Sequence, residues 1–91
     1  MSSTPNNSDE IANQLKQILL DVLRLDIPLE AIKDQTNLYD LGLESLNVVE
    51  LLTDAETEFD IIVDVEDLSE DLFARFGNLR RYIQEKVNEA D

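Results

Sequence analysis

One serine of this sequence, Ser45, stands where a hydroxyl group could be used for chemistry. It lies in the segment Asp40-Leu41-Gly42-Leu43-Glu44-Ser45-Leu46, directly before a stretch with the apolar spacing of a helix. Gly42 permits a tight or left-handed turn there. A phosphoester on a serine in the first turn of a helix would be stabilised by free backbone N–H groups and by the helix dipole. An unmodified serine that only caps the helix fits the same position, so the spacing leaves both interpretations open.

The composition excludes most other kinds of reactive site. The 91 residues include no cysteine and no histidine. Disulfides, thiolate catalysis, zinc sites built on these residues and a histidine-activated serine are therefore excluded. A cluster of carboxylates lacks the central glycine and the ligand order of a calcium-binding loop, namely Asp60, Asp64, Glu66 and Asp67. We expect no metal site and no catalytic residue.

Negative charge is concentrated in one part of the chain. The formal net charge is −14, and the stretch from Asp40 to Asp71 contains twelve acidic residues and no lysine or arginine. Such a field repels nucleic acids and anionic lipids and attracts basic protein surfaces. We therefore expect protein partners with basic patches, no nucleic acid and no membrane. The alternative is that the charge only keeps a small domain soluble.

The length fits one domain with a small core. We expect residues 1–7, which are polar, to form a flexible tail and residues 8–91 to form the folded domain. No stretch approaches the ~20 apolar residues of a membrane span, and residues 1–7 lack the features of a secretory signal. We therefore expect a cytoplasmic protein, and a monomer.

The first part of the chain predicts one helix followed by a long loop. Ser8 is expected to cap the helix, and its apolar stripe runs to about Leu25, before Pro28. Residues 27–43 have irregular apolar spacing, and a loop of this length is usually functional or packed by its own side chains. One helical turn is expected near Leu29.

The second helix should begin near Glu44 or Ser45. Its buried face is assigned to residues three or four positions apart, namely Leu46, Val49, Leu52 or Thr53, Ala55 or Glu56, and Phe59. The side toward water then carries Asn47, Glu50, Asp54, Thr57 and Glu58. Val48 and Leu51 do not fit this stripe, and they belong either to a wide apolar face or to a surface for a partner.

The segment Phe59–Val65 has the composition of a strand. No second segment of this kind exists to pair with it, so we reject a sheet. We interpret the segment as an extended connection that inserts Ile61 or Ile62, together with Val63, into a helical core.

Two more helices complete the predicted fold. A short third helix is capped by Ser69 and broken by Gly77, and Asn78 is expected to cap the last helix. The inner face of that helix is assigned to Leu79, Tyr82 or Ile83, and Val87. The sequence therefore predicts an all-α, mainly up-and-down four-helix bundle with a long first loop and a short third helix.

This arrangement resembles the acyl carrier protein family and the related carrier domains of polyketide and nonribosomal peptide synthesis. In that family an Asp-x-Gly-x-Asp-Ser-Leu motif precedes a helix containing Val-Glu-Leu. Here the segment Asp40–Leu46 leads to Val49-Glu50-Leu51. The likeness extends over residues 8–88 and includes Thr36-Asn37-Leu38, Glu58-Phe59-Asp60 and Tyr82-Ile83.

The resemblance implies that Ser45 carries 4'-phosphopantetheine, installed from coenzyme A by a phosphopantetheinyl transferase. The sulfur would belong to the cofactor, so a chain without cysteine could carry acyl groups as thioesters without being an enzyme. The implied partners are that transferase and acyl-activating, acyltransferase or synthase enzymes of fatty acid, modified-lipid or polyketide biosynthesis. An aminoacyl or peptidyl carrier and an unmodified acidic interaction module are the alternatives.

The same resemblance implies a docking surface for basic partners. Its residues are Glu44, Leu46, Asn47, Val49, Glu50 and Glu56. Core positions near the cargo, where packing is the expected role, are Leu52, Phe59 and Ile62. Glu44 replaces the usual aspartate, and Asn47 and Thr57 are neutral where fatty-acid carriers often have acids. These departures point to a specialised stand-alone carrier.

Overall fold

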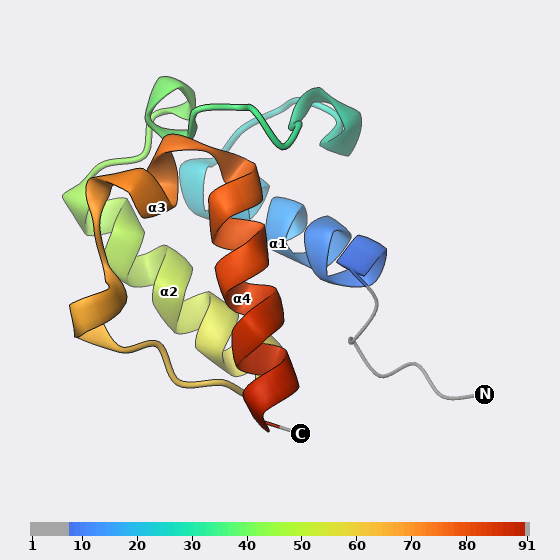
Figure 1. Cartoon of the computed structure of the whole chain (residues 1–91). Helices are drawn as coiled ribbons and strands as arrows, with labels where there is room; N and C mark the ends of the chain where they lie inside the picture. Colours follow the sequence, from blue (N-terminus) through green and yellow to red (C-terminus); the bar gives the residue numbers. More distant parts are fainter. Residues whose placement is uncertain (1–7, 91) are drawn as a thin grey trace.

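The computed structural model describes residues 8–90, and the predicted tail, residues 1–7, and the side chain of Ser8 lie outside what it describes. Within this range there are four α-helices and three short 3-10 helices and no strand (Figure 1). The α-helices are α1 (Ser8–Leu23), α2 (Ser45–Phe59), α3 (Glu70–Ala74) and α4 (Phe76–Ala90). The 3-10 helices are η1 (Leu29–Ala31), η2 (Leu38–Leu41) and η3 (Val65–Asp67). The all-α fold with a short third helix is confirmed.

The helices form a bundle in which α1 contacts both α2 and α4, while α3 bridges α4 and η2. Figure 1 shows the first loop, residues 24–44, spanning the end of the bundle at which α2 and α4 begin. The helical turn predicted near Leu29 is present as η1. None of the described helices is long and apolar enough to cross a bilayer.

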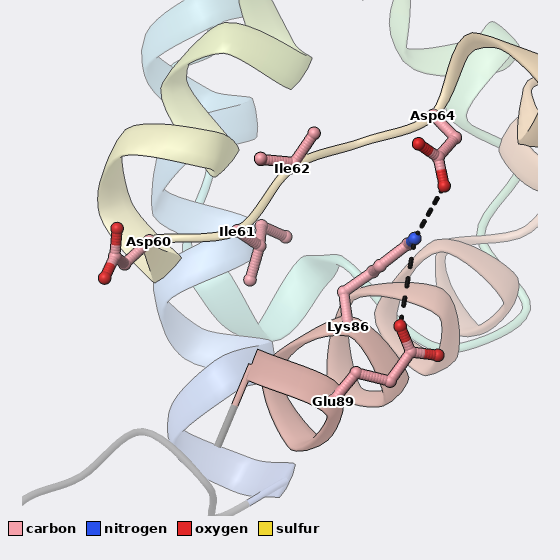
Figure 2. A pocket seen from close by; sticks show the side chains of 6 residues that line it. All are labelled: Asp60, Ile61, Ile62, Asp64, Lys86 and Glu89. Carbon is pink, nitrogen blue, oxygen red and sulfur yellow. Dashed lines mark hydrogen bonds and ion pairs between the residues drawn. The ribbon is translucent and has the colours of Figure 1, made fainter.

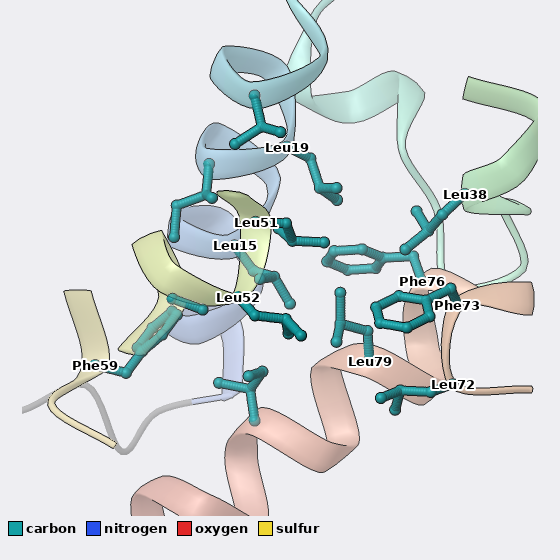
Figure 3. Close-up of a cluster of buried hydrophobic side chains, with 14 of the residues drawn as sticks. Leu15, Leu19, Leu38, Leu51, Leu52, Phe59, Leu72, Phe73, Phe76 and Leu79 are labelled. Carbon is teal, nitrogen blue, oxygen red and sulfur yellow. The ribbon is translucent and has the colours of Figure 1, made fainter. Parts of the chain in front are cut away.

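The core is built from the apolar stripes of these helices (Figure 3). Leu15 and Leu19 of α1 meet Leu51 of α2 and Phe76 and Leu79 of α4, and all five side chains are fully buried. The stripes predicted for α1 and α4 are therefore confirmed. No polar or charged side chain is buried among residues 9–89.

The buried face of α2 differs from the predicted one. Leu46 and Val49 are 85% and 66% exposed, whereas Val48 packs against the core and Leu51 is completely buried. The buried stripe consists of Val48, Leu51, Leu52, Ala55 and Phe59. This stripe continues at helical spacing to the end of α2, whereas the stripe through Leu46 and Val49 runs into polar Thr53. The predicted docking role of Leu46 and Val49 fits their exposure, and their predicted burial was wrong.

The segment after α2 is extended, and it inserts one isoleucine together with Val63, as predicted. Ile61 is buried and Val63 packs against the core, while Ile62 is 76% exposed. Neighbouring side chains of an extended chain point to opposite sides, so both isoleucines cannot face the core. The assignment of Ile62 to the core was therefore wrong.

Helix α1 ends two residues earlier than predicted. Arg24 adopts a left-handed conformation with φ of 55°. The N–H of Leu25 donates to the carbonyl of Leu20 at 2.9 Å, and the N–H of Arg24 donates to that of Asp21 at 3.3 Å. This is the hydrogen-bond pattern of a Schellman cap, so the turn at Arg24 ends α1 before Pro28 is reached.

The predicted boundary between the third and fourth helices was also wrong. Ser69 caps α3 as expected, since its hydroxyl accepts the N–H of Leu72 at 3.3 Å. Arg75, and not Gly77, breaks the helix by taking extended backbone angles. Asn78 lies inside α4, where its amide donates to the carbonyl of Asp71 at 2.8 Å.

Gly77 lets the first loop approach the start of α4. The N–H groups of Phe76 and Gly77 donate to the carbonyls of Thr36 and Asp34, each at 2.8 Å. A Cβ atom on Gly77 would lie 3.1 Å from the carbonyl oxygen of Asp34. Loop carbonyls thereby satisfy N–H groups in the first turn of α4, and the loop that leads to Ser45 is fixed to the bundle.

Candidate functional site

A tight turn positions the chain directly before Ser45. Gly42 follows η2 with φ of 106°, a left-handed conformation of the kind that glycine permits at this turn. The N–H of Gly42 donates to the carbonyl of Tyr39 at 3.1 Å, and the N–H of Leu43 donates to that of Leu38 at 3.2 Å. Leu38 and Leu43 are buried, so both ends of this turn are anchored in the core.

Ser45 is the first residue of α2, and its side chain is exposed. The capping position belongs to Glu44, whose backbone is extended and whose N–H donates to the side-chain oxygen of Asn47 at 3.0 Å. Ser45 is therefore not the cap of α2. Its hydroxyl lies in the turn where backbone N–H groups have no partner within the helix, a setting that favours a bound phosphate.

A groove of about 540 Å³ opens beside Ser45. Its apolar lining consists of Leu43 at the end of the first loop, Val48 of α2, Leu68 before α3 and Phe73 of α3. Its polar lining consists of Tyr39, Glu44, Ser45, Ser69 and Glu70. The groove thus combines an apolar surface with hydrogen-bonding groups along the side that carries Ser45.

Tyr39 is one of the residues that line this groove. Its hydroxyl donates to the backbone carbonyl of Glu70 at 3.2 Å and so joins η2 to α3. Partial desolvation, and then the nearby carboxylates of Glu70 and Asp71, raise the pKa of Tyr39. The phenol therefore stays protonated and able to donate. Sequence reasoning missed this residue, because the contact joins positions 31 residues apart and no local pattern signals it.

The structure brings together some of the predicted docking residues and gives others a structural contact. Leu46, Val49 and Glu50 are exposed on α2, one to five positions after Ser45. Asn47 is half-buried and holds the backbone of Glu44, as described above.

Glu56 has a contact inside the fold. Its side chain is half-buried, and its carboxylate accepts the N–H of Val63 at 2.8 Å. This hydrogen bond therefore holds the segment that follows α2 against the helix. The exposed acids of this helix are Glu50, Asp54 and Glu58, and no lysine or arginine is present in α2.

Two cations of α4, Arg80 and Lys86, are paired with acids of other segments. Arg80 forms an ion pair with Asp34 at 3.1 Å, and Lys86 forms one with Asp64 at 3.0 Å. Across residues 8–90, no three carboxylates lie close enough together to hold a metal ion. The exposed carboxylates of α2 therefore face solvent without a cation from their own helix.

Comparisons with known proteins identify the class to which this site belongs. Residues 13–84 match the family model described as a phosphopantetheine attachment site. The chain is 31% identical over 81 residues to an acyl carrier protein of Karelsulcia muelleri, covering 89% of this chain and 94% of that protein. It is 32% identical over 79 residues to an acyl carrier protein of Thermotoga maritima, covering 87% of this chain and 94% of that protein.

These matches define a phosphopantetheine-binding carrier protein. The chain belongs to the acyl carrier protein family, and its cofactor is covalently attached 4'-phosphopantetheine. The site described above fits that group. The start of α2 suits a phosphodiester, and the groove beside it offers both apolar and hydrogen-bonding surface to a flexible arm.

Proposed function

We propose that Ser45 is the attachment point of 4'-phosphopantetheine and that the protein carries acyl groups as thioesters on this arm. It would deliver them, in the cytoplasm, to enzymes of fatty acid, modified-lipid or polyketide biosynthesis. The observation that supports this most directly is the exposed Ser45 at the start of α2, one position after the capping residue. Bound there, the cofactor supplies the thiol that the chain lacks.

The residues around Ser45 have distinct roles in this proposal. The N-terminal turn of α2 stabilises the phosphate through backbone N–H groups and the helix dipole. The groove lined by Val48, Leu68 and Phe73 offers a place where the arm and its cargo lie against the protein. Tyr39 lines the same groove, and its hydroxyl is held there by the hydrogen bond to the carbonyl of Glu70. The chain needs no catalytic group for these tasks, because the reactions take place on its partners.

Docking is assigned to the exposed side of α2. Leu46 and Val49 give two apolar contacts near Ser45, and Glu50 adds a carboxylate beside them. A partner surface with lysine or arginine around a small apolar area complements this arrangement. The phosphopantetheinyl transferase is the first such partner, followed by the enzymes that load and use the cargo.

The test is a modification assay on the purified protein with coenzyme A and a phosphopantetheinyl transferase. Intact mass should increase by one phosphopantetheine group in the wild type and should not change in Ser45→Ala. Ser69→Ala is the matched control, because Ser69 lines the same groove and caps α3, and it should still be modified.

Modification of the Ser45→Ala protein would refute the assignment of this residue. A wild-type chain that stays unmodified with several transferases would refute the carrier proposal and leave an acidic interaction module. The mass of the cargo on protein from its native cells would then separate a fatty or polyketide load from an amino acid.

A further inference from the structure

Helix α3 has only five residues, and it lines the groove beside Ser45 through Glu70 and Phe73. A helix of this length is not stable by itself, so contacts with other segments must hold it in place. The residues on either side of it, Ser69 and Arg75, have extended backbone angles, with φ of −149° and −145°. Helix α3 is therefore a separate unit between two extended joints and not a continuation of α4.

Side chains of two other segments bind backbone carbonyls of α3. The hydroxyl of Tyr39 donates to the carbonyl of Glu70 at 3.2 Å, and the side-chain amide of Asn78 donates to that of Asp71 at 2.8 Å. Asn78 belongs to α4, which follows α3 directly, whereas Tyr39 belongs to η2 and is 31 positions away from its partner. Tyr39 thus joins α3 to the first loop, and Asn78 joins it to α4.

The η2 end of the Tyr39 contact is anchored in the fold. Leu38, the preceding residue, is fully buried. The side-chain oxygen of Asn37 accepts the N–H of Tyr39 at 2.8 Å and so fixes the start of η2. Tyr39 therefore extends from a fixed support, and α3 is the part that can move if the hydrogen bond is lost.

The segment that leads into α3 is held by α4. The ammonium nitrogen of Lys86 lies 3.0 Å from a carboxylate oxygen of Asp64, as drawn in Figure 2. The hydroxyl of Tyr82 donates to the carboxylate of Asp67 at 2.9 Å. A displacement of α3 would therefore bend the chain at its two joints and leave the preceding segment in place.

The groove lies directly over the core. Leu43 and Phe73 line the groove and are buried in the core cluster, and Val48 lines it and packs against that cluster. Helix α3 also contributes Leu72 to the core. A movement of α3 away from η2 would therefore open a path from the groove into the apolar interior.

We propose that Tyr39 is a positioning residue, which holds α3 against η2 and so limits how far an acyl chain on the arm enters the core. The inference rests on the proposed function and extends it to the size of the cargo. A short acyl group lies in the groove with α3 in place, whereas a longer chain enters the core only when α3 is displaced. The net contribution of one such hydrogen bond changes the equilibrium between the two positions of α3 by about fivefold.

The experiment loads the full chain with acetyl- or octanoyl-phosphopantetheine from the corresponding acyl-coenzyme A and measures how fast hydroxylamine cleaves each thioester. Tyr39→Phe keeps the ring and removes the donor. It should slow cleavage of the octanoyl thioester by up to about fivefold, because a chain that enters the core draws its thioester against the protein. Cleavage of the acetyl thioester should not change. Tyr82→Phe is the matched control with wild-type rates, because it also removes a tyrosine hydroxyl that donates a hydrogen bond but does not line the groove.

Four results would overturn the inference. An unchanged ratio of octanoyl to acetyl cleavage rates in Tyr39→Phe, with the protein modified at Ser45, would remove the positioning role and leave the proposed function intact. The same slowing in Tyr82→Phe would show a general loosening of the fold. Loss of the helical circular dichroism signal in Tyr39→Phe would show that the hydroxyl supports the whole fold and not α3 alone. A wild type that is never modified at Ser45 would remove both the inference and the proposed function.

Discussion

Substitution of Asn47 distinguishes a structural role from a docking role for a residue near Ser45. The sequence placed it among the docking residues, whereas in the structure its side-chain oxygen accepts the N–H of Glu44 at 3.0 Å. Loss of this hydrogen bond at an exposed helix end costs about 1 kcal/mol. Alanine is a better helix former than asparagine and offsets roughly half of that cost. Asn47→Ala should therefore lower the free energy of unfolding by about 0.5 kcal/mol and the melting temperature by roughly 2–4 °C.

Urea unfolding followed by circular dichroism measures the stability, and the transferase assay measures the KM of the same proteins. Asn47→Asp is the matched control, because it keeps the accepting oxygen and adds a negative charge at the start of a helix, where it is favourable. We expect Asn47→Asp to be at least as stable as the wild type and Asn47→Ala to keep the wild-type KM. A several-fold rise in KM for Asn47→Ala without any loss of stability would refute the capping role and favour direct contact with the partner.

Three further predictions concern charge, packing and pH. Glu50→Lys should raise the transferase KM several-fold at low salt, and the difference should disappear near 1 M salt, where the Debye screening length is about 3 Å. Glu85→Lys, at an exposed position of α4, is the control and should leave the KM unchanged. A difference in KM that persists at high salt would contradict docking by charge. Gly77→Ala should lower the midpoint of urea unfolding despite the better helix propensity of alanine, because the added Cβ atom would lie 3.1 Å from the carbonyl oxygen of Asp34. An equal or higher midpoint would contradict the close approach of the first loop to α4. Burial, and then a hydrogen bond to Asp67, raise the pKa of Tyr82. Its contribution to stability is therefore complete below pH of about 10 and is lost as the pH rises through the folded-state pKa. A free energy of unfolding that rises above pH 10, or that falls equally in Tyr82→Phe, would contradict this.

Much of the fold and the core of the candidate site could be predicted from the sequence. Apolar residues at three- and four-residue spacing specify helices, so the elements and the inner faces of α1 and α4 followed from periodicity. Gly42 was interpreted as permitting a tight or left-handed turn, and its φ of 106° agrees. The start of α2 at Ser45 agrees with the start near Glu44 or Ser45 that the local pattern predicted. Each of these features depends on residues that are close neighbours in the chain.

Packing between distant segments decided what the sequence could not. Helix α2 carries two overlapping apolar stripes, and only its packing in the bundle selected Val48 and Leu51 for the core and left Leu46 exposed. The first loop fixed the role of Gly77, because the carbonyl that approaches it belongs to Asp34.

The groove beside Ser45 and the outward position of Ile62 arose in the same way. The groove joins the end of the first loop, α2 and α3, and the extended segment after α2 turns Ile61 inward and Ile62 outward. The sequence by itself thus determined the helices, the turn before Ser45 and the acidic character of the chain. The tertiary structure decided which side chains contact each other and which remain exposed, because those contacts join residues tens of positions apart. A local pattern of apolar and polar residues does not specify which other segment will pack against it.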